Sequence, residues 1–408
     1  IDPSTNLELQ LGYKNGKVEM RKSSDLFLTS PDKENNNTYI LGRWQHDFNQ
    51  NHKVSVQGYV QSDSTKQEFI ACAPTLSFDS NVRDIYRSNP DWADVVALSM
   101  PAYGSDADVT SVVDAILADA ISADDLSIGI SSLREHQVII TNEEMALAKQ
   151  ALQNVPNISN DMGEIICGRG NTSISEQRID LEWQDTMRWS DQLRTVGGLS
   201  YRQDSANSNT FFKGRVDNEA WRAFINAEYK IRPSLILNTG AMYEYETHNQ
   251  EAFSPRVALN ILLAPQQSIR FVISQALRSP DFLESQPDYS ITLKSLFNTD
   301  GSDNNYLNLS QADFYMEQDE DDEKHLKQEE ITSYEIGYYH AINSQVELDI
   351  KVFHEELTDL ISEPITLDSR GISNDNEMNI DGAELQISGH LDLNHSYWLA
   401  YSYIDTDV

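Results

Sequence analysis

The chain has 408 residues, and its 30 Lys and Arg against 65 Asp and Glu give a formal net charge of −35. This charge excludes nucleic acid as a natural partner, because phosphate binding relies on clustered Lys and Arg. Aromatic residues make up 9% of the chain, which is not typical of disorder, and no run of about 18 apolar residues occurs, which excludes membrane-spanning helices.

Both ends of the chain are interpreted as cuts through a larger protein. The sequence begins Ile1-Asp2-Pro3 without an initiator Met or a signal peptide, and it stops at Val408 just after an alternating run. A processed mature domain is the alternative.

Alternation of apolar and polar residues with a period of two is the main pattern of the chain. Between Val346 and Val352, four apolar side chains alternate with Glu, Asp and Lys, as in a strand whose two faces meet unlike surroundings. Similar runs occur at 7–13, 179–184, 225–231, 235–246 and 383–393. The sequence therefore predicts an all-β fold with long strands.

Short and longer connections between these runs largely alternate. Tight polar turns are predicted at 15–16, 49–51, 190–191, 232–234, 264–267, 343–344 and 394–395. Longer connections are predicted at 29–37, 71–172, 205–218, 278–328 and 362–376. About 14 strands joined in this way are typical of an outer-membrane barrel, with its apolar face toward lipid and its charged face toward a wet or plugged lumen. A soluble β-sandwich would have loops of mixed length at both ends.

Residues 71–172 interrupt the strand pattern. Apolar residues at helical spacing run from Val109 to Ala120, and a capping-box sequence at 141–144 precedes a second helical pattern that reaches Leu152. We therefore predict barrel strands at 1–70, an extracellular loop insert with two short helices at 71–172, and barrel strands at 173–408 with a long extracellular loop at 278–328.

Several motifs in the second half of the chain resemble the barrel of TonB-dependent outer-membrane receptors. They are the stretch from Phe253-Ser254-Pro255-Arg256 to Arg278-Ser279-Pro280 and Glu284, the strand 329–338, and the Gly-x-Glu strand at 379–385. The resemblance covers about 173–408, and residues 1–70 match it only in their strand pattern.

This resemblance implies an incomplete antiparallel transmembrane β-barrel, with about 14 of 22 strands around a lumen that a plug domain would fill. It implies a receptor in the bacterial outer membrane that imports a scarce nutrient by an energised mechanism, most often a ferric siderophore and sometimes cobalamin or a glycan. The implied partners are TonB-ExbB-ExbD, acting through a plug that this sequence lacks, and outer-membrane lipid and lipopolysaccharide. No enzyme activity and no cofactor are expected.

Two other functions remain open from the sequence. A passive outer-membrane porin would share the strand pattern but would have no plug. A secreted, acidic all-β adhesin or carbohydrate-binding protein would be soluble without detergent.

Cys72 and Cys167 bracket the insert closely, and they are too few for a disulfide scaffold or a structural zinc site. In the oxidising compartment that the resemblance implies, they are expected to pair. Closing the loop between them would contribute about 4–5 kcal/mol in the chain-entropy treatment. Two unrelated thiols are the alternative.

Loop residues are the expected ligand contacts, because strands serve as the scaffold. Arg and Tyr suit anionic or catecholate groups through charge-assisted hydrogen bonds and stacking. The candidates are Arg278, Asp281, Tyr289, Tyr306 and Tyr315 in one loop, and Arg202, Phe211, Phe212 and Arg215 near another. For Arg278-Ser279-Pro280, shaping the strand exit is the alternative. Glu244, Arg256 and Glu384 are predicted to face the lumen and the missing plug.

The densest charge cluster is the acidic run at 317–323. A solvated loop is the first interpretation. The alternative is a divalent-cation site formed by Asp319, Asp321 and Glu323, which could also bridge to lipopolysaccharide phosphates. The run lacks EF-hand spacing, and the nine scattered His residues predict no other metal site.

Overall fold

The computed structural model of the chain describes residues 4–19, 27–29, 32–131, 137–158, 164–249, 251–286, 290–298, 311–315, 326–362, 373–390 and 394–407. Its largest unit is a 13-stranded sheet in which neighbouring strands are antiparallel. In order across the sheet these are β1 (Thr5–Val18), β3 (Lys33–Asn49), β4 (His52–Lys66), β7 (Ile174–Arg188), β8 (Leu193–Ser208), β9 (Gly214–Arg232), β10 (Leu235–Glu246), β11 (Ala252–Ala264), β12 (Gln267–Arg278), β15 (Glu329–Asn343), β16 (Val346–Ser362), β17 (Ser373–His390) and β18 (Ser396–Asp407).

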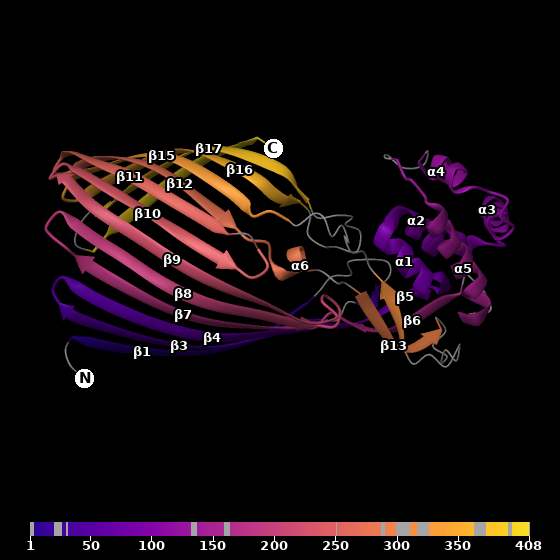
Figure 1. Ribbon diagram of the computed structural model, residues 1–408. Helices are drawn as coiled ribbons and strands as arrows, with labels where there is room; N and C mark the ends of the chain where they lie inside the picture. The colour runs from indigo at the N-terminus through magenta and orange to yellow at the C-terminus, as the bar shows by residue number, and fades with distance from the viewer. Residues whose placement is uncertain are drawn as a thin grey trace.

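This sheet curls into the wall of an open barrel (Figure 1). Short turns, such as Pro233-Ser234 between β9 and β10, join the strands at one end, and the long connections lie at the other end. We call these the turn end and the loop end. The predicted all-β, incomplete antiparallel barrel is confirmed, and the described residues place thirteen strands in its wall where about 14 were expected.

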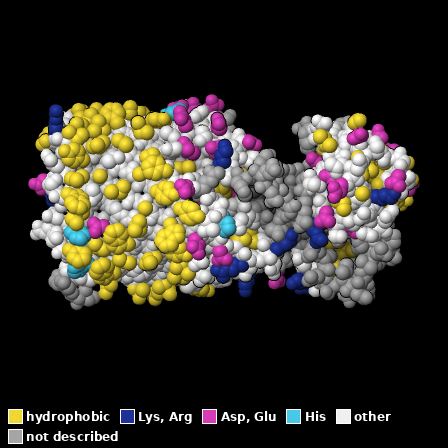
Figure 2. Space-filling view, viewed as in Figure 1, with side chains coloured by type: hydrophobic (Ala, Val, Ile, Leu, Met, Phe, Trp, Pro, Cys, Tyr) yellow, Lys and Arg dark blue, Asp and Glu magenta, His cyan; other side chains and the backbone are white. Residues whose placement is uncertain are grey.

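Side chains alternate between the two faces of the sheet, as a period of two requires. Large apolar side chains are exposed on the outer face, including Leu199 at 58%, Ile225 at 57% and Phe253 at 57%. Hydrophobic side chains gather in large patches on the face of the barrel seen in Figure 2. Ile350 and Val352 of the predicted run are 36% and 46% exposed, so no second protein layer in the described part of the chain covers them.

Three predicted connections are wrong because the strands continue farther toward the loop end. The predicted turn at Asn15-Gly16 lies inside β1, where Asn15 pairs with Asn36 of β3 and donates a side-chain hydrogen bond of 2.6 Å to it. The predicted connection 29–37 overlaps β3, and the predicted connection 205–218 shrinks to the five residues between β8 and β9. Cross-strand pairing thus outweighs the local preference of Asn and Gly for turns.

A helical unit occupies the insert. Its helices are α1 (Ser80–Ser88), α2 (Pro90–Asp94), α3 (Ala107–Leu117), α4 (Ala123–Ser131) and α5 (Asn142–Ile158). The two helices predicted from spacing correspond to α3 and α5, and α1, α2 and α4 were not predicted. None of the helices in the described ranges is long and apolar enough to cross a membrane.

The insert has a hydrophobic core of its own. Trp92, Ile85 and Val113 are fully buried there, together with residues from all five helices. The predicted capping box of α5 is present: Glu144 accepts a 2.8 Å hydrogen bond from the Thr141 backbone N–H and donates its own N–H to Thr141 Oγ1 at 3.2 Å. Glu144 also accepts from Ser88 Oγ at 2.8 Å, which ties α1 to α5.

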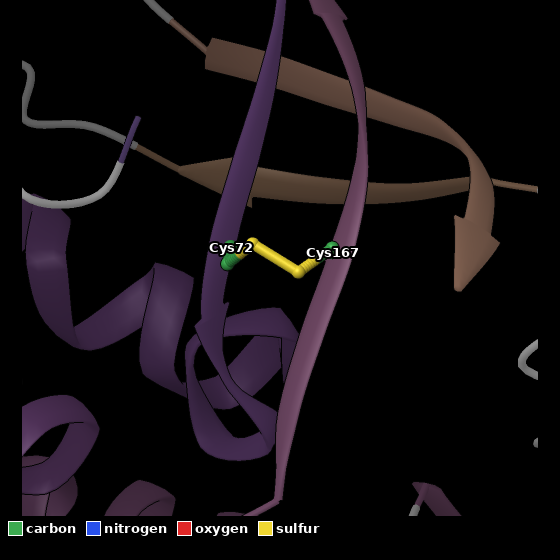
Figure 3. Close-up of a disulfide and its surroundings, with 2 residues drawn as sticks. All are labelled: Cys72 and Cys167. Atoms are coloured by element: carbon green, nitrogen blue, oxygen red, sulfur yellow. A yellow bond between two sulfur atoms is a disulfide. The ribbon is translucent and has the colours of Figure 1, made fainter. Parts of the chain in front are cut away.

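A second, five-stranded sheet connects the insert to two other loops. Its order is β14 (Gln311–Tyr315), β13 (Ser290–Asn298), β6 (Ile165–Asn171), β5 (Glu68–Pro74) and β2 (Phe27–Thr29). Strand β5 leads into the insert and strand β6 leads out of it, and Cys72 on β5 lies directly opposite Cys167 on β6 (Figure 3). The predicted disulfide is confirmed, with an S–S distance of 2.10 Å and a Cα–Cα distance of 4.0 Å. Three connections therefore join into one structure at the loop end (Figure 1).

Candidate functional site

The inner face of the barrel carries an ionic network near the loop end. Arg202 on β8 lies 2.8 Å from Asp204 of the same strand and 3.2 Å from Glu246 on β10. Asp204 also pairs with Arg178 on β7 at 2.5 Å. Alternation on β7, β8 and β10 brings these side chains together, because each of them projects inward from its strand.

The network is buried and densely hydrogen-bonded at its acidic end. Glu246 is only 3% exposed, and it accepts hydrogen bonds from Asn218 at 3.3 Å and from Asn249 at 2.5 Å, in addition to the ion pair with Arg202. A buried carboxylate keeps its charge only when such partners replace the water it has lost. Three side chains therefore hold the Glu246 carboxylate in this part of the wall.

A cavity of about 420 Å³ lies above this network at the loop end. This volume is within the range of small-molecule sites. Strands β4, β7, β8, β9 and β10 form one side, and the segment 279–286 forms the other. The lining residues that matter for its chemistry are Asp63, Glu176, Arg178, Arg202, Asp204, Phe212, Glu246, His248, Asp281, Phe282 and Gln286.

The short helix α6 (Phe282–Ser285) lines the cavity on the side opposite the strands, and it lies at the loop end of the barrel (Figure 1). It has a capping box: Asp281 Oδ1 accepts from the backbone N–H of Leu283 at 2.8 Å and of Glu284 at 2.9 Å, and Glu284 Oε2 accepts from the Asp281 N–H at 2.7 Å. Two reciprocal caps explain how so short a helix forms. The Phe282 ring packs edge-on against Phe212, with the ring centres 6.2 Å apart.

Arg278 anchors α6 to the barrel wall. Its guanidinium pairs with Glu284 of α6 at 3.0 Å and also with Glu329, the first residue of β15. Ser279 accepts a 3.1 Å hydrogen bond from Gln328 beside it. Arg278 is not among the residues that line the cavity. These contacts favour the alternative interpretation, in which Arg278-Ser279-Pro280 shapes the exit of the strand.

The turn after β8 positions two predicted aromatic residues. Ser208 Oγ accepts hydrogen bonds from the backbone N–H groups of Thr210 and Phe211, both at 3.2 Å, and donates to the Ser173 carbonyl at 2.8 Å. Phe212 is buried at 7% exposure and lines the cavity, and the Phe211 ring lies beside it at 6.4 Å.

The structure brings together some of the predicted ligand contacts. Arg202, Phe212 and Asp281 line the cavity, with Phe211 and Arg278 adjacent to it. Arg215 lies apart from the cavity lining and pairs with Asp217 at 2.6 Å. Tyr289 and Tyr306 lie outside the described residues, as do the acidic run and its candidate cation ligands Asp319, Asp321 and Glu323; Tyr315 ends β14, and its side chain is likewise outside them.

The three residues predicted to face the lumen alternate with outer-face neighbours. Glu244 is 7% exposed and pairs with Arg222, whereas Tyr243 and Tyr245 on either side of it are exposed. Glu384 pairs with Lys351 at 2.9 Å. Arg256 lines a second cavity of about 440 Å³ with Arg194, Glu228 and Arg270. Their contact with a plug stays a prediction.

Sequence reasoning missed Asp63, Glu176 and Phe282. Alternation places Asp63 and Glu176 on the inner face, and the structure pairs them directly across β4 and β7. Phe282 follows the Arg-Ser-Pro-Asp stretch, where the capping box Asp281-x-x-Glu284 is a usable signal. Across the described ranges, no three His, Cys, Asp or Glu side chains group closely enough to hold a metal ion.

The rim of the barrel carries a further ion pair outside the cavity. Lys327, just before β15, lies 2.8 Å from Asp359 of β16. The hydrogen bond to this carboxylate, and then its negative charge, raise the pKa of Lys327. The contact helps to hold the segment that follows the long connection against the strand ends.

Comparison with known proteins shows which sequences and structures this chain resembles. The sequence profile described as "TonB dependent receptor-like, beta-barrel" matches residues 4–408. A search of curated protein sequences found no match. Among solved structures, the FrpB iron transporter from Neisseria meningitidis has 11% identity and a TM-score of 0.54, with 99% of this chain and 51% of that chain covered. The copper transporter OprC has 13% identity and a TM-score of 0.51, with the same two coverages. At these identities the likeness concerns the fold, and this chain spans about half the length of those proteins.

Proposed function

The chain belongs to the TonB-dependent receptor-like β-barrel family, and from this premise we propose that it is the barrel part of an outer-membrane receptor for energised uptake of a scarce nutrient. The observation that carries the proposal is the cavity at the loop end, fixed by the ionic network below it and covered by α6. Ligand capture at this end and passage through the lumen fit the arrangement.

The outer face supports a position in the outer membrane. Exposed Leu, Ile, Val, Phe, Tyr and Trp side chains lie on the outer face of the barrel wall (Figure 2). Contact of such a surface with water is unfavourable, whereas contact with lipid is not. The charged inner face requires water or a filling domain instead. A soluble adhesin would need a covered apolar face, so this alternative is the less favoured one.

A metal chelate is the proposed cargo, with a ferric siderophore as the first candidate. Two solved structures of this fold are named as an iron transporter and a copper transporter. The cavity combines charged groups with two Phe rings, a mixture that suits a chelate with polar and apolar parts. We further propose that TonB-ExbB-ExbD drives uptake through a plug domain, that lipid and lipopolysaccharide surround the barrel, and that the protein has no catalytic step.

Growth of a strain that lacks the gene tests this function. The strain should lose growth on one scarce nutrient when ferric siderophores, cobalamin and glycans are supplied singly, and a plasmid copy of the gene should restore it. Undiminished growth and uptake on every source would refute import. The same uptake measured without TonB separates the passive porin: porin-like entry would continue, whereas energised uptake would stop.

A further inference from the structure

The charge of the cavity wall is opposite to the one that an anionic chelate needs. Five carboxylates line the cavity, against two guanidinium groups, the imidazole of His248 and no Lys among the described residues: Asp63, Glu176, Asp204, Glu246 and Asp281 against Arg178 and Arg202. Charges on the wall of a partly closed cavity act through a medium of lower dielectric constant than water, so this excess affects ligand choice.

Both guanidinium groups are already occupied. Arg178 pairs with Asp204, and Arg202 pairs with Asp204 and with Glu246, which is 3% exposed. An anionic ligand would have to separate one of these pairs and leave a carboxylate without its partner in a poorly solvated place. Such a step is strongly unfavourable. The arginines therefore shape the cavity wall and are not available to bind an anion.

Three of the five carboxylates lack such a cation among the described residues. One of them, Asp281, accepts hydrogen bonds from backbone N–H groups of α6, which leaves two. Asp63 and Glu176 lie opposite each other on β4 and β7, and neither forms an ion pair with a described residue. Within the described ranges, Asp63 accepts hydrogen bonds only from the neutral side-chain amides of Asn37 and, at 2.6 Å, of Gln61. Two adjacent negative charges that face one cavity repel each other, and a cation between or above them reduces this repulsion.

The other wall offers apolar and polar contacts that suit an organic solute. Phe212 and Phe282 form the edge-on ring pair. Next to them, the side-chain Nε2 of Gln286 is buried and has no hydrogen-bond partner in the described structure. A buried donor without a partner is costly, and a ligand oxygen would satisfy it.

We propose that this cavity binds a positively charged organic solute, through its ammonium group at Asp63 and Glu176 and its apolar part at Phe212 and Phe282. This inference rests on the proposed function: the cargo is then a metal chelate that carries an ammonium group, and not an anionic catecholate complex. It replaces the expectation that Arg202 recognises a negative charge.

Binding of three matched probes to the intact receptor tests the proposal. The probes are a linear ferric trihydroxamate with a terminal ammonium group, its neutral N-acetyl derivative and its anionic N-succinyl derivative, which share one iron centre and differ in charge. Titration calorimetry with the purified full-length protein should show the ammonium probe binding at least about tenfold more tightly than the succinyl probe. Equal or tighter binding of the succinyl probe, or no binding of the ammonium probe, overturns the proposal.

Variants assign the effect to the cavity. In the D63N/E176Q variant, the preference for the ammonium probe should fall to within about threefold. The matched control D108N/D124N removes two exposed carboxylates from α3 and α4 of the insert, and it should keep the wild-type preference. The single E176Q variant should give an intermediate ratio if the double variant does not fold. An unchanged ratio in a folded D63N/E176Q or E176Q protein also overturns the proposal.

The converse variant is Asp204→Asn, which frees Arg178 and Arg202 from a shared partner. It should raise the affinity for the succinyl probe, and a folded D204N protein without this gain contradicts the pairing argument. Cellular uptake separates the two levels of inference. Energised uptake of the succinyl probe in preference to the ammonium probe would support import and refute the charge preference. Tight binding of the ammonium probe without its uptake would support the charge preference and refute import.

Discussion

Arg202 reaches across β9 to Glu246, so that one ion pair of 3.2 Å joins β8 to a strand that it does not hydrogen-bond. Glu246 is 3% exposed, and its carboxylate is held by Arg202 and by the two Asn side chains that also donate to it. The pair therefore contributes to the stability of the barrel wall beneath the cavity and to the charge of that wall.

Substitution Glu246→Ala should destabilise the barrel by about 1–3 kcal/mol, because it leaves buried donors without their acceptor. Glu246→Gln should cost less, since one acceptor remains. The temperature at which the barrel unfolds, followed by its heat-modifiable migration on gels, measures the change. Glu377→Gln on the exposed part of β17 serves as control. A loss in E377Q as large as that in E246A would contradict the assignment.

Removal of the disulfide should weaken the insert and leave the barrel folded. The C72A/C167A variant loses a cross-link that closes a sequence separation of 95 residues, for which the chain-entropy treatment gives about 4–5 kcal/mol and measured values are commonly about 2–4 kcal/mol. Fluorescence of Trp92, which is fully buried in the insert core, should report unfolding at a lower temperature. The comparison needs a background in which the other Trp residues are replaced by Phe. An unchanged insert transition would show that the core alone is sufficient.

Alternation along the chain was enough to predict the barrel, because the two faces of its sheet carry unlike side chains, apolar on the outside and polar or charged on the inside. The apolar run at Val346–Val352 and the inward position of Glu244 follow from that contrast alone. Strand ends were harder to predict. Asn15 and Gly16 have the composition of a turn, yet their partners on β3 keep them extended beyond the apolar surface.

The cavity could be predicted only in part. Asp63 and Glu176 follow from alternation, but their partners across the cavity come from 279–286, and sequence spacing does not indicate how three distant connections meet. The same limit applies to the five-stranded sheet, where β13 pairs with β6 more than a hundred residues away. Cys72 and Cys167 were predictable because their chemistry leaves few alternatives, whereas α1 and α2 were missed although Asp79 and Asn89 cap them.

A charge on the outer face should disrupt the barrel. Ile225 is 57% exposed on β9, opposite Gly197 of β8. Ile225→Arg should destabilise the protein by about 2–4 kcal/mol if the residue lies near the middle of the bilayer, whereas Ile225→Leu should change little. Refolding into lipid vesicles followed by urea titration measures both variants. Equal stability of the two would mean that this face does not meet lipid.

Arg278 should control how firmly α6 covers the cavity. Its guanidinium pairs with Glu284 and with Glu329, so Arg278→Gln removes the contacts that join α6 to β15. Hydrogen exchange of the backbone amides at 282–286 should then rise by about tenfold or more, because each charge-assisted pair lost is worth about 1.5 kcal/mol in protection. The capping box keeps part of the helix in place, since Asp281 and Glu284 do not depend on Arg278 for their backbone hydrogen bonds.

The matched control for this measurement is Arg188→Gln at the turn end, where Arg188 pairs with the highly exposed Asp191. It also removes one guanidinium from an ion pair, but far from α6, so exchange at 282–286 should stay at the wild-type rate. The rate of ligand dissociation is a second measure of how firmly α6 is held over the cavity. With α6 released, the ammonium probe should leave faster from R278Q than from R188Q. Unchanged exchange and unchanged dissociation in R278Q would show that the Phe212–Phe282 contact, and not the ion pairs, holds the cover closed.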